Sequence, residues 1–280
     1  MHFKLLDSLS LPGDAAKPNE DALTHGGRFA AVLDGATGLG EKLMPGRSDA
    51  QWLAQFAARR LQAHAESDLG NLREWIRGAA AEAEKGFAAL RKRAPVERYE
   101  VPFASLIAVS LGDGALHALW FGDCAALIRS NDGAVTMLGE TFDKRAREKE
   151  RAVKMGPKPA GAGVREEFLP ALRASRNKVN RRGGEWLFAP DTKCADHAQT
   201  ADAAVSAGDL VLLASDGFLA LAVDYARYTP QSLLEAAQPG GLGALGEEIR
   251  AIETADPEGA RYPRFKKSDD ATALLLSVAP

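Results

Sequence analysis

The stretch Phe29-Ala30-Ala31-Val32-Leu33-Asp34-Gly35 is an apolar run that ends abruptly in an acid and a glycine. A short apolar run bounded by glycines predicts a buried strand. Asp34 therefore lies where the strand leaves the core, and Gly35 lets the backbone turn so that its carbonyl approaches whatever Asp34 binds. Such a pair of oxygen donors suits a hard divalent cation. Taken alone, however, Asp-Gly after a strand is better explained as an ordinary turn.

Further acids recur at predicted strand edges, which favours a cation site over a simple turn. The acidic segments are Asn19-Glu20-Asp21, Trp120-Phe121-Gly122-Asp123, Val211 to Gly217 with Asp216, and Ser268-Asp269-Asp270. Buried carboxylates without partners are costly, and like charges that converge repel each other. Bound cations would remove both costs.

The composition limits the class of protein. The chain has 280 residues, of which 46% are hydrophobic and 26% are charged, and it shows no repeat or clear linker, so a single domain over 1–280 is expected. A net charge of -3 gives no reason to expect a nucleic-acid partner. No apolar stretch predicts a membrane span, and the N-terminal residues do not resemble a signal peptide. Two cysteines form no disulfide framework, so a cytosolic location is expected.

Hydrophobic periodicity predicts an α+β fold with two sheets covered on the outside by helices. The four strands expected between 103 and 138 read as one antiparallel meander with hairpin turns. The other expected strands cover 3–11, 29–34, 186–188, 211–216 and 271–278. Helices are expected at 48–61, 68–90, 219–228, 230–237 and 242–253, and also at 145–154 and 166–179 within a highly charged segment.

The order of the acidic motifs resembles that of the metal-dependent Ser/Thr protein phosphatases, the protein phosphatase 2C-like (PPM) family. The matching segments are Asn19 to Ala22, Val32 to Gly35, Phe121 to Cys124, Leu213 to Gly217 and Ser268 to Thr272. Each motif alone is weak, but the ordered set extends over almost the whole chain. The resemblance implies a four-layer αββα sandwich, in which helices flank two central antiparallel sheets, with a variable flap at about 141–181.

The resemblance also implies a site for two Mg²⁺ or Mn²⁺ ions, with a third, weaker ion possible. Asp34 would bridge the two ions, and Asp216 and Asp269 would complete one coordination shell; these three are the implied catalytic residues. The carbonyl of Gly35 and, through water, Glu20 would serve the other ion. Asp21 would hold a surrounding water or ligand, and Asp123 would serve the third ion.

Several positions depart from the family pattern. Many members have an arginine before the acidic pair that binds the substrate phosphate. Here Ala16 stands in that place and Lys17 follows, which fits a phosphate-binding residue and a solvated loop residue equally well. Ala36 replaces a histidine of eukaryotic members, and Ala220 replaces an acid that supports the third ion. Asp270 stands where the family usually has asparagine.

The function implied by the resemblance is hydrolysis of phosphoserine and phosphothreonine by a hydroxide that bridges the two ions. The expected partner is a phosphorylated protein, together with a cognate Ser/Thr kinase. Two alternatives remain open. One is a catalytically impaired phosphoprotein-binding or regulatory member of the same fold, and the other is a small-molecule phosphatase that uses the same metals.

Overall fold

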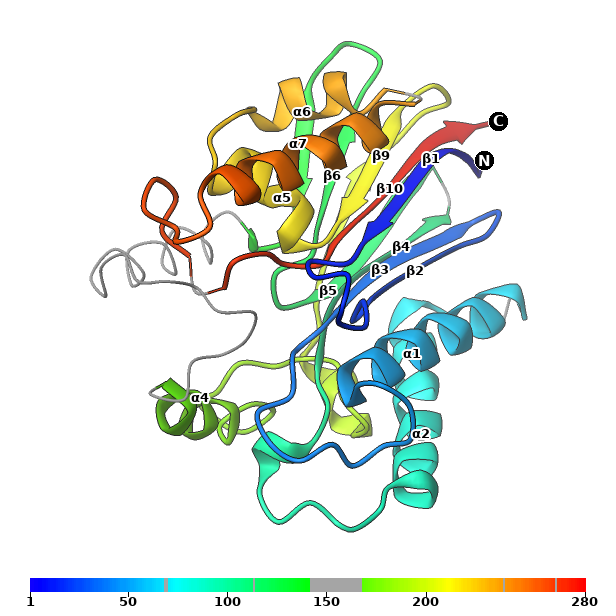
Figure 1. Cartoon of the computed structure of the whole chain (residues 1–280). Coiled ribbons are helices and arrows are strands. Elements are labelled where there is room, and N and C mark those ends of the chain that lie inside the picture. The colour runs from blue at the N-terminus through cyan, green and yellow to red at the C-terminus, as the bar shows by residue number, and fades with distance from the viewer. Residues whose placement is uncertain (68–69, 113, 142–167, 239, 265) are drawn as a thin grey trace.

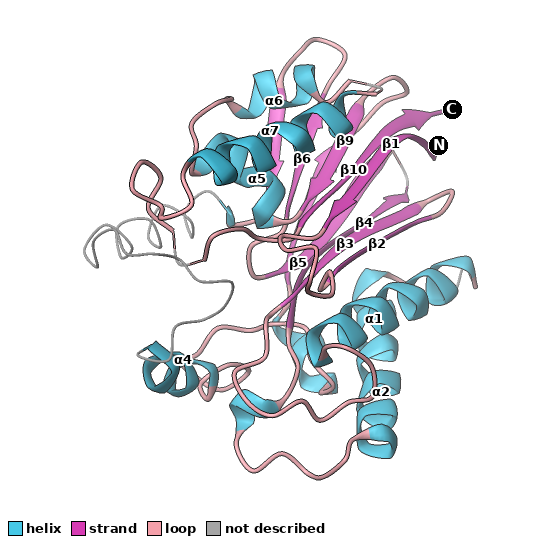
Figure 2. Cartoon of the chain, in the orientation of Figure 1, coloured by secondary structure: helices cyan, strands magenta, loops and turns pink. Residues whose placement is uncertain are grey.

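The computed structural model describes the whole chain except residues 68–69, 113, 142–167, 239 and 265. Two five-stranded antiparallel sheets lie face to face between two groups of helices (Figures 1 and 2). The first sheet has the order β1-β10-β9-β6-β7 and the second the order β2-β3-β4-β5-β8. The expected α+β class and αββα layering are therefore confirmed.

The first sheet joins strands from both ends of the chain. Its strands are β1 (His2–Leu11), β10 (Ala271–Ala279), β9 (Leu210–Ala214), β6 (Ala125–Arg129) and β7 (Val135–Leu138). The second sheet contains β2 (Asp21–His25), β3 (Phe29–Gly35), β4 (Ala104–Gly112), β5 (Ala115–Phe121) and β8 (Gln199–Ala204). Because β1 pairs with β10 along its length, the two chain ends lie together at one edge of the molecule (Figure 1).

Three apolar cores separate the four layers. Alternate residues of each strand point to opposite faces of a sheet. In β10, Leu274 and Leu276 therefore enter the core between the sheets, while Leu275 packs under the helices. The helices α5 (Asp216–Val223), α6 (Pro230–Ala236) and α7 (Gly241–Ala255) cover the first sheet, and α1 (Asp49–Glu66) and α2 (Leu72–Leu90) cover the second.

The four strands between 104 and 138 do not form one meander, so that prediction is wrong. β4 pairs with β5 in the second sheet and β6 pairs with β7 in the first, and the chain crosses between the sheets at Gly122 and Asp123. Gly122 has a φ of +68°, and a Cβ at this position would lie 2.2 Å from the Oγ atom of Ser105. Only glycine fits this crossing, which delivers Asp123 to the space between the sheets.

Capping side chains determine where the helices begin. Ser48 accepts hydrogen bonds from the first turn of α1, as expected. The second helix was expected from residue 68, but α2 begins at Leu72, since Asn71 and Glu74 form a capping box there. Similarly, α5 begins at Asp216 rather than at residue 219.

The charged segment 141–181 is described only in part. The helix expected at 145–154 lies outside the described residues, and α4 (Leu169–Arg176) covers part of the helix expected at 166–179. Two short 3₁₀ helices occupy Arg98–Glu100 and Thr192–His197. Among the described residues, no helix combines the length and the apolar character that crossing a membrane requires.

Candidate metal centre

Polar side chains close one end of the core between the sheets. Val32 and Ile107 belong to that core, so strand alternation places Asp34 and Ser105, two residues away in each strand, on the same face. Asp21 is the register partner of Asp34 on β2. The opposite sheet contributes Ser10 and Thr272 at this end, and Ser215 follows its strand β9.

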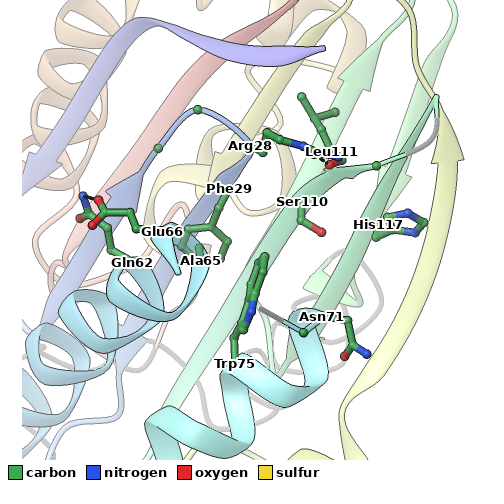
Figure 3. A pocket seen from close by; sticks show the side chains of 14 residues that line it. Arg28, Phe29, Gln62, Ala65, Glu66, Asn71, Trp75, Ser110, Leu111 and His117 are labelled. Atoms are coloured by element: carbon green, nitrogen blue, oxygen red, sulfur yellow. Dashed lines mark hydrogen bonds between the residues drawn. The ribbon is translucent and has the colours of Figure 1, made fainter. Parts of the chain in front are cut away.

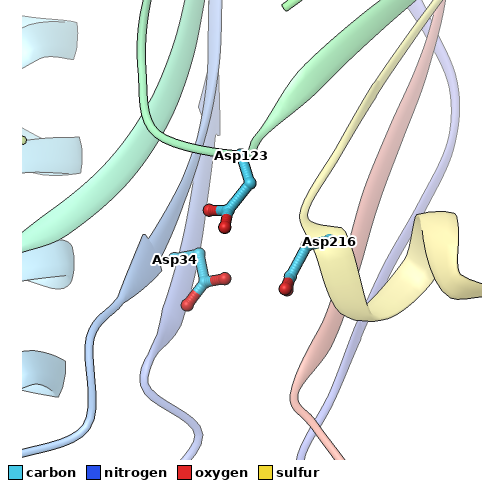
Figure 4. A group of neighbouring side chains, drawn as sticks. All are labelled: Asp34, Asp123 and Asp216. Atoms are coloured by element: carbon cyan, nitrogen blue, oxygen red, sulfur yellow. The ribbon is translucent and has the colours of Figure 1, made fainter. Parts of the chain in front are cut away.

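Three aspartates from different elements converge at this end of the core. Asp34 is the penultimate residue of β3, Asp123 lies in the crossing between the sheets, and Asp216 begins α5 (Figure 4). A carboxylate oxygen of each lies within 4.8 Å of an oxygen of each of the other two. Ser105 donates a hydrogen bond of 2.6 Å to Asp123 and so fixes the orientation of its carboxylate. We call Asp34, Asp123 and Asp216 the acidic cluster.

Burial and mutual repulsion destabilise the charged form of the cluster. Burial raises the pKa of Asp34 well above its ordinary value, and the charges of Asp21, Asp216, Asp269 and Asp123 raise it further. Burial also raises the pKa of Asp21, as do the charges of Asp270 and Asp269, against a smaller lowering by the hydroxyls of Ser215 and Thr272. Among the described residues, however, neither carboxylate oxygen of Asp21 accepts a hydrogen bond of normal geometry. Buried carboxylate oxygens that repel one another fit a hard divalent cation.

The raised pKa values predict an unusual pH dependence for the metal-free protein. Between the ordinary carboxyl pKa and the raised values, the folded chain binds more protons than the unfolded chain does. The free energy of unfolding should therefore fall as the pH rises from 5 to 8. Each unit by which a pKa is raised corresponds to about 1.4 kcal/mol. Urea unfolding in the presence of EDTA measures this slope, and Mn²⁺ should reduce it. A stability that rises over this range without metal would contradict the assignment.

The C-terminal acids lie beside the cluster and join its loops. Asp269 contacts the ammonium group of Lys266, and its charge acts on both Asp34 and Asp21. Asp270 accepts hydrogen bonds from the backbone N–H groups of Gly13 (2.7 Å) and Glu20 (2.6 Å), one with each carboxylate oxygen. An asparagine could accept only one of these bonds, which explains the acid at this position.

The remaining predicted residues lie around this centre. The carboxylate of Glu20 accepts hydrogen bonds from the hydroxyls of Thr37 and Ser48, and its carbonyl accepts one from the N–H of Gly35 at 3.1 Å. Lys17 is exposed on the loop before β2 and bonds through its backbone N–H to Asp14. The structure thus brings the acids of the five motifs to one end of the sandwich, while Lys17 lies in solvent.

Two residues at the centre were missed by the sequence reasoning. Ser105 belongs to none of the sequence motifs, and its place in the site follows only from its strand register with Asp34. Lys266 lies two residues before the Ser268 motif, so a basic residue so close to predicted ligands was a usable signal. Burial alone would lower the pKa of Lys266, but the charges of Asp269, Asp34 and Asp216 and the hydrogen bond to Asp269 raise it.

A cavity of about 250 Å³ lies away from this centre, at the other end of β3. Figure 3 shows its walls, which come from the loop before β3, from α1 and α2, and from the ends of β4 and β5. Phe29, Trp75 and His117 are among its lining residues. Phe29 is the first residue of β3 and Asp34 is its penultimate one, so this cavity is separate from the acidic cluster.

The chain is thus an α+β protein whose four-layer αββα sandwich gathers carboxylates that could hold a metal ion at one end of its central core. The sequence matches the model of one protein family, described as protein phosphatase 2C, over residues 14–150. This match covers just under half of the chain, which is therefore similar to the protein phosphatase 2C family in that part. No curated protein has a significantly similar sequence.

Solved structures of bacterial phosphatases share the fold over the whole chain. The Mycobacterium tuberculosis serine/threonine phosphatase PstP/Ppp aligns with a TM-score of 0.59 at 16% identity and 100% coverage of both chains. The catalytic domain of PstP in complex with two manganese ions aligns at 0.57 and 17%, covering 100% of this chain and 99% of that one. The S. agalactiae serine/threonine phosphatase gives 0.56 and 14%, with 99% and 100% coverage.

Proposed function

We propose that this chain is a metal-dependent phosphoprotein phosphatase that hydrolyses phosphoserine and phosphothreonine esters. The observation that carries the proposal is the convergence of Asp34, Asp123 and Asp216 at one end of a phosphatase 2C fold. The structurally similar PstP domain is described with two manganese ions, which supports two Mg²⁺ or Mn²⁺ ions here. The substrate would be a phosphorylated protein, supplied by a cognate Ser/Thr kinase.

We assign Asp34, Asp216 and Asp269 as the principal metal ligands. Asp123 contributes from within the cluster, and the Gly35 carbonyl, Glu20 and Asp21 contribute around it. When bound, the ions supply an activated water nucleophile at neutral pH and stabilise the charge on the phosphoryl oxygens. All these donors are oxygen atoms, as Mg²⁺ and Mn²⁺ prefer.

The protein's own residues hold this arrangement in place. Ser105 orients Asp123, and Asp270 ties the loop of Glu20 to the strand that follows Asp269. Cys124 is buried beside Asp123, and burial together with the nearby carboxylates raises the pKa of its thiol, so it stays protonated and does not act as a nucleophile. The chemistry therefore depends on the carboxylates.

We further propose that residues 1–280 act as one catalytic unit. Ligands come from near both ends of the chain, and β1 and β10 pair directly. The two free, buried cysteines suit a reducing compartment such as the cytosol.

The test is phosphate release from an aryl phosphate and from a phosphothreonine peptide, titrated with Mn²⁺. We expect activity on both that requires the metal and is abolished by EDTA. Phosphosugars and nucleotides serve as comparison substrates, and a strong preference for them would replace the protein-phosphatase assignment with a small-molecule one. Absence of activity at every Mn²⁺ concentration, in protein shown to be folded, would favour a phosphoprotein-binding module.

A further inference from the structure

Lys266 is a cation at the edge of an otherwise acidic site. Its ammonium group contacts the carboxylate of Asp269. The Lys266 side chain is 43% exposed and that of Asp269 is 21% exposed, whereas Asp216 is only 7% exposed. Lys266 is thus the more exposed partner of this ion pair, whereas Asp123 and Asp216 of the acidic cluster are buried.

The carboxylate of Asp256 organises the described residues that precede Lys266. Asp256 accepts hydrogen bonds from the backbone N–H groups of Ala260, Arg261 and Tyr262 at 2.8–3.1 Å. It also pairs with Arg264 at 2.9 Å, and both side chains of this ion pair are about one-tenth exposed.

Further hydrogen bonds fix the chain on both sides of Lys266. Arg264 donates to the carbonyl of Lys267 at 2.9 Å, one residue beyond Lys266. From α7, Arg250 donates to the carbonyl of Asp269 at 2.8 Å. Two arginines and one buried carboxylate thus hold the described backbone on either side of Lys266, whose side chain contacts Asp269.

We propose that Lys266 binds the phosphoryl oxygens of the substrate at the mouth of the acidic cluster, an inference that rests on the phosphatase function proposed above. A phosphate dianion that approaches several carboxylates needs a cation besides the metal ions, and a lysine on a flexible stem binds phosphate as a point charge. Lys17, on the loop before the acidic pair, is exposed and makes no side-chain contact with the acidic cluster among the described residues. Lys266, in contrast, is already beside a proposed ligand.

The experiment compares three variants of the full chain. Lys266→Met removes the charge and keeps the length of the side chain, Lys266→Arg restores a charge, and Lys267→Met removes the charge of the exposed neighbour. Binding of inorganic phosphate to the Mn²⁺-loaded protein is measured by its competition with the aryl phosphate and by calorimetry. Mn²⁺ affinity is measured separately by electron paramagnetic resonance, which needs no turnover.

We expect Lys266→Met to weaken phosphate binding by about 10- to 100-fold, the range for a hydrogen bond to a charged group. KM for the aryl phosphate should rise in parallel, and Mn²⁺ affinity should not fall. Lys266→Arg should recover most of the phosphate affinity, and Lys267→Met should behave like the wild type.

The contrary outcomes are distinct. If Lys266→Met binds phosphate as tightly as the wild type, the assignment of Lys266 is wrong and the phosphatase function stands. The same conclusion follows if its sole change is a higher affinity for Mn²⁺. A comparable loss in Lys267→Met would show a general charge effect and would also overturn it. If the wild type binds neither Mn²⁺ nor phosphate, the proposed function itself fails, and this inference fails with it.

Discussion

Replacing Asp34 by asparagine should reduce Mn²⁺-dependent phosphate release by more than about 100-fold, since loss of even an outer-shell partner of a metal costs about 10- to 100-fold. The same substitution should make the metal-free protein more stable at pH 7–8. Asp34 is held among four other carboxylates that raise its pKa, and a neutral amide of the same shape removes that repulsion. Loss of activity with a gain in stability is the expected signature of a metal ligand.

The measurements are phosphate release, Mn²⁺ binding and urea unfolding in EDTA. Asp202→Asn is the matched control, because Asp202 lies on the edge strand β8, pairs with His117 and is 69% exposed. This control should change neither activity nor stability appreciably. Unchanged activity in Asp34→Asn would refute the metal assignment. Loss of activity together with loss of stability would show that Asp34 supports the fold instead.

Gly217→Ala should destabilise the protein by about 1–3 kcal/mol or more, the usual range for overpacking. Gly217 is the second residue of α5, and a Cβ there would lie 2.0 Å from the carbonyl oxygen of Asp270 and 3.2 Å from the Cβ of Asp269. Backbone atoms cannot move aside as a flexible side chain can. The added methyl group should therefore push Asp269 and Asp270 away from Asp216, so Mn²⁺ affinity should fall as well.

Gly243→Ala provides a matched control within α7. A Cβ at Gly243 meets nothing within 4 Å, so the same substitution should stabilise the protein by up to about 1 kcal/mol through helix propensity alone. Urea unfolding and Mn²⁺ titration of both variants distinguish the local clash from a general effect of alanine. Equal stabilities for the two variants would show that α5 and the Asp269 loop are not closely packed.

The sequence predicts the acids of this centre because each follows or precedes a short apolar run. Asp34, Asp216 and Asp269 are marked by such runs, and strand ends in a sandwich meet at one end of the core. The alternating pattern does not show which sheet a strand joins, however. β6 is as apolar as β5, so only the turn at Gly122 reveals the crossing.

Other features depend on contacts between residues that are distant in sequence. β8, Gln199–Ala204, is an edge strand whose residues are mostly exposed and include few good strand formers, so local pattern did not predict it. The place of Lys266 depends on the Asp256–Arg264 ion pair and on Arg250 of α7, which no sequence motif marks. Lys17 was singled out because of its position in a motif, whereas the structure leaves it exposed.

The pairing of β1 with β10 has a consequence for biosynthesis. Of the described strands, β1 comes earliest in the sequence and its neighbour in the sheet, β10, comes last, with Asp269 just before it. Until β10 has been synthesised, β1 has no partner strand in its sheet, and Asp269, a proposed ligand, is absent. Nascent chains should therefore be inactive and, with an open strand edge, prone to associate. If the proposed function is right, a chain interrupted before β10 should show no phosphatase activity, since it lacks the partner strand of β1.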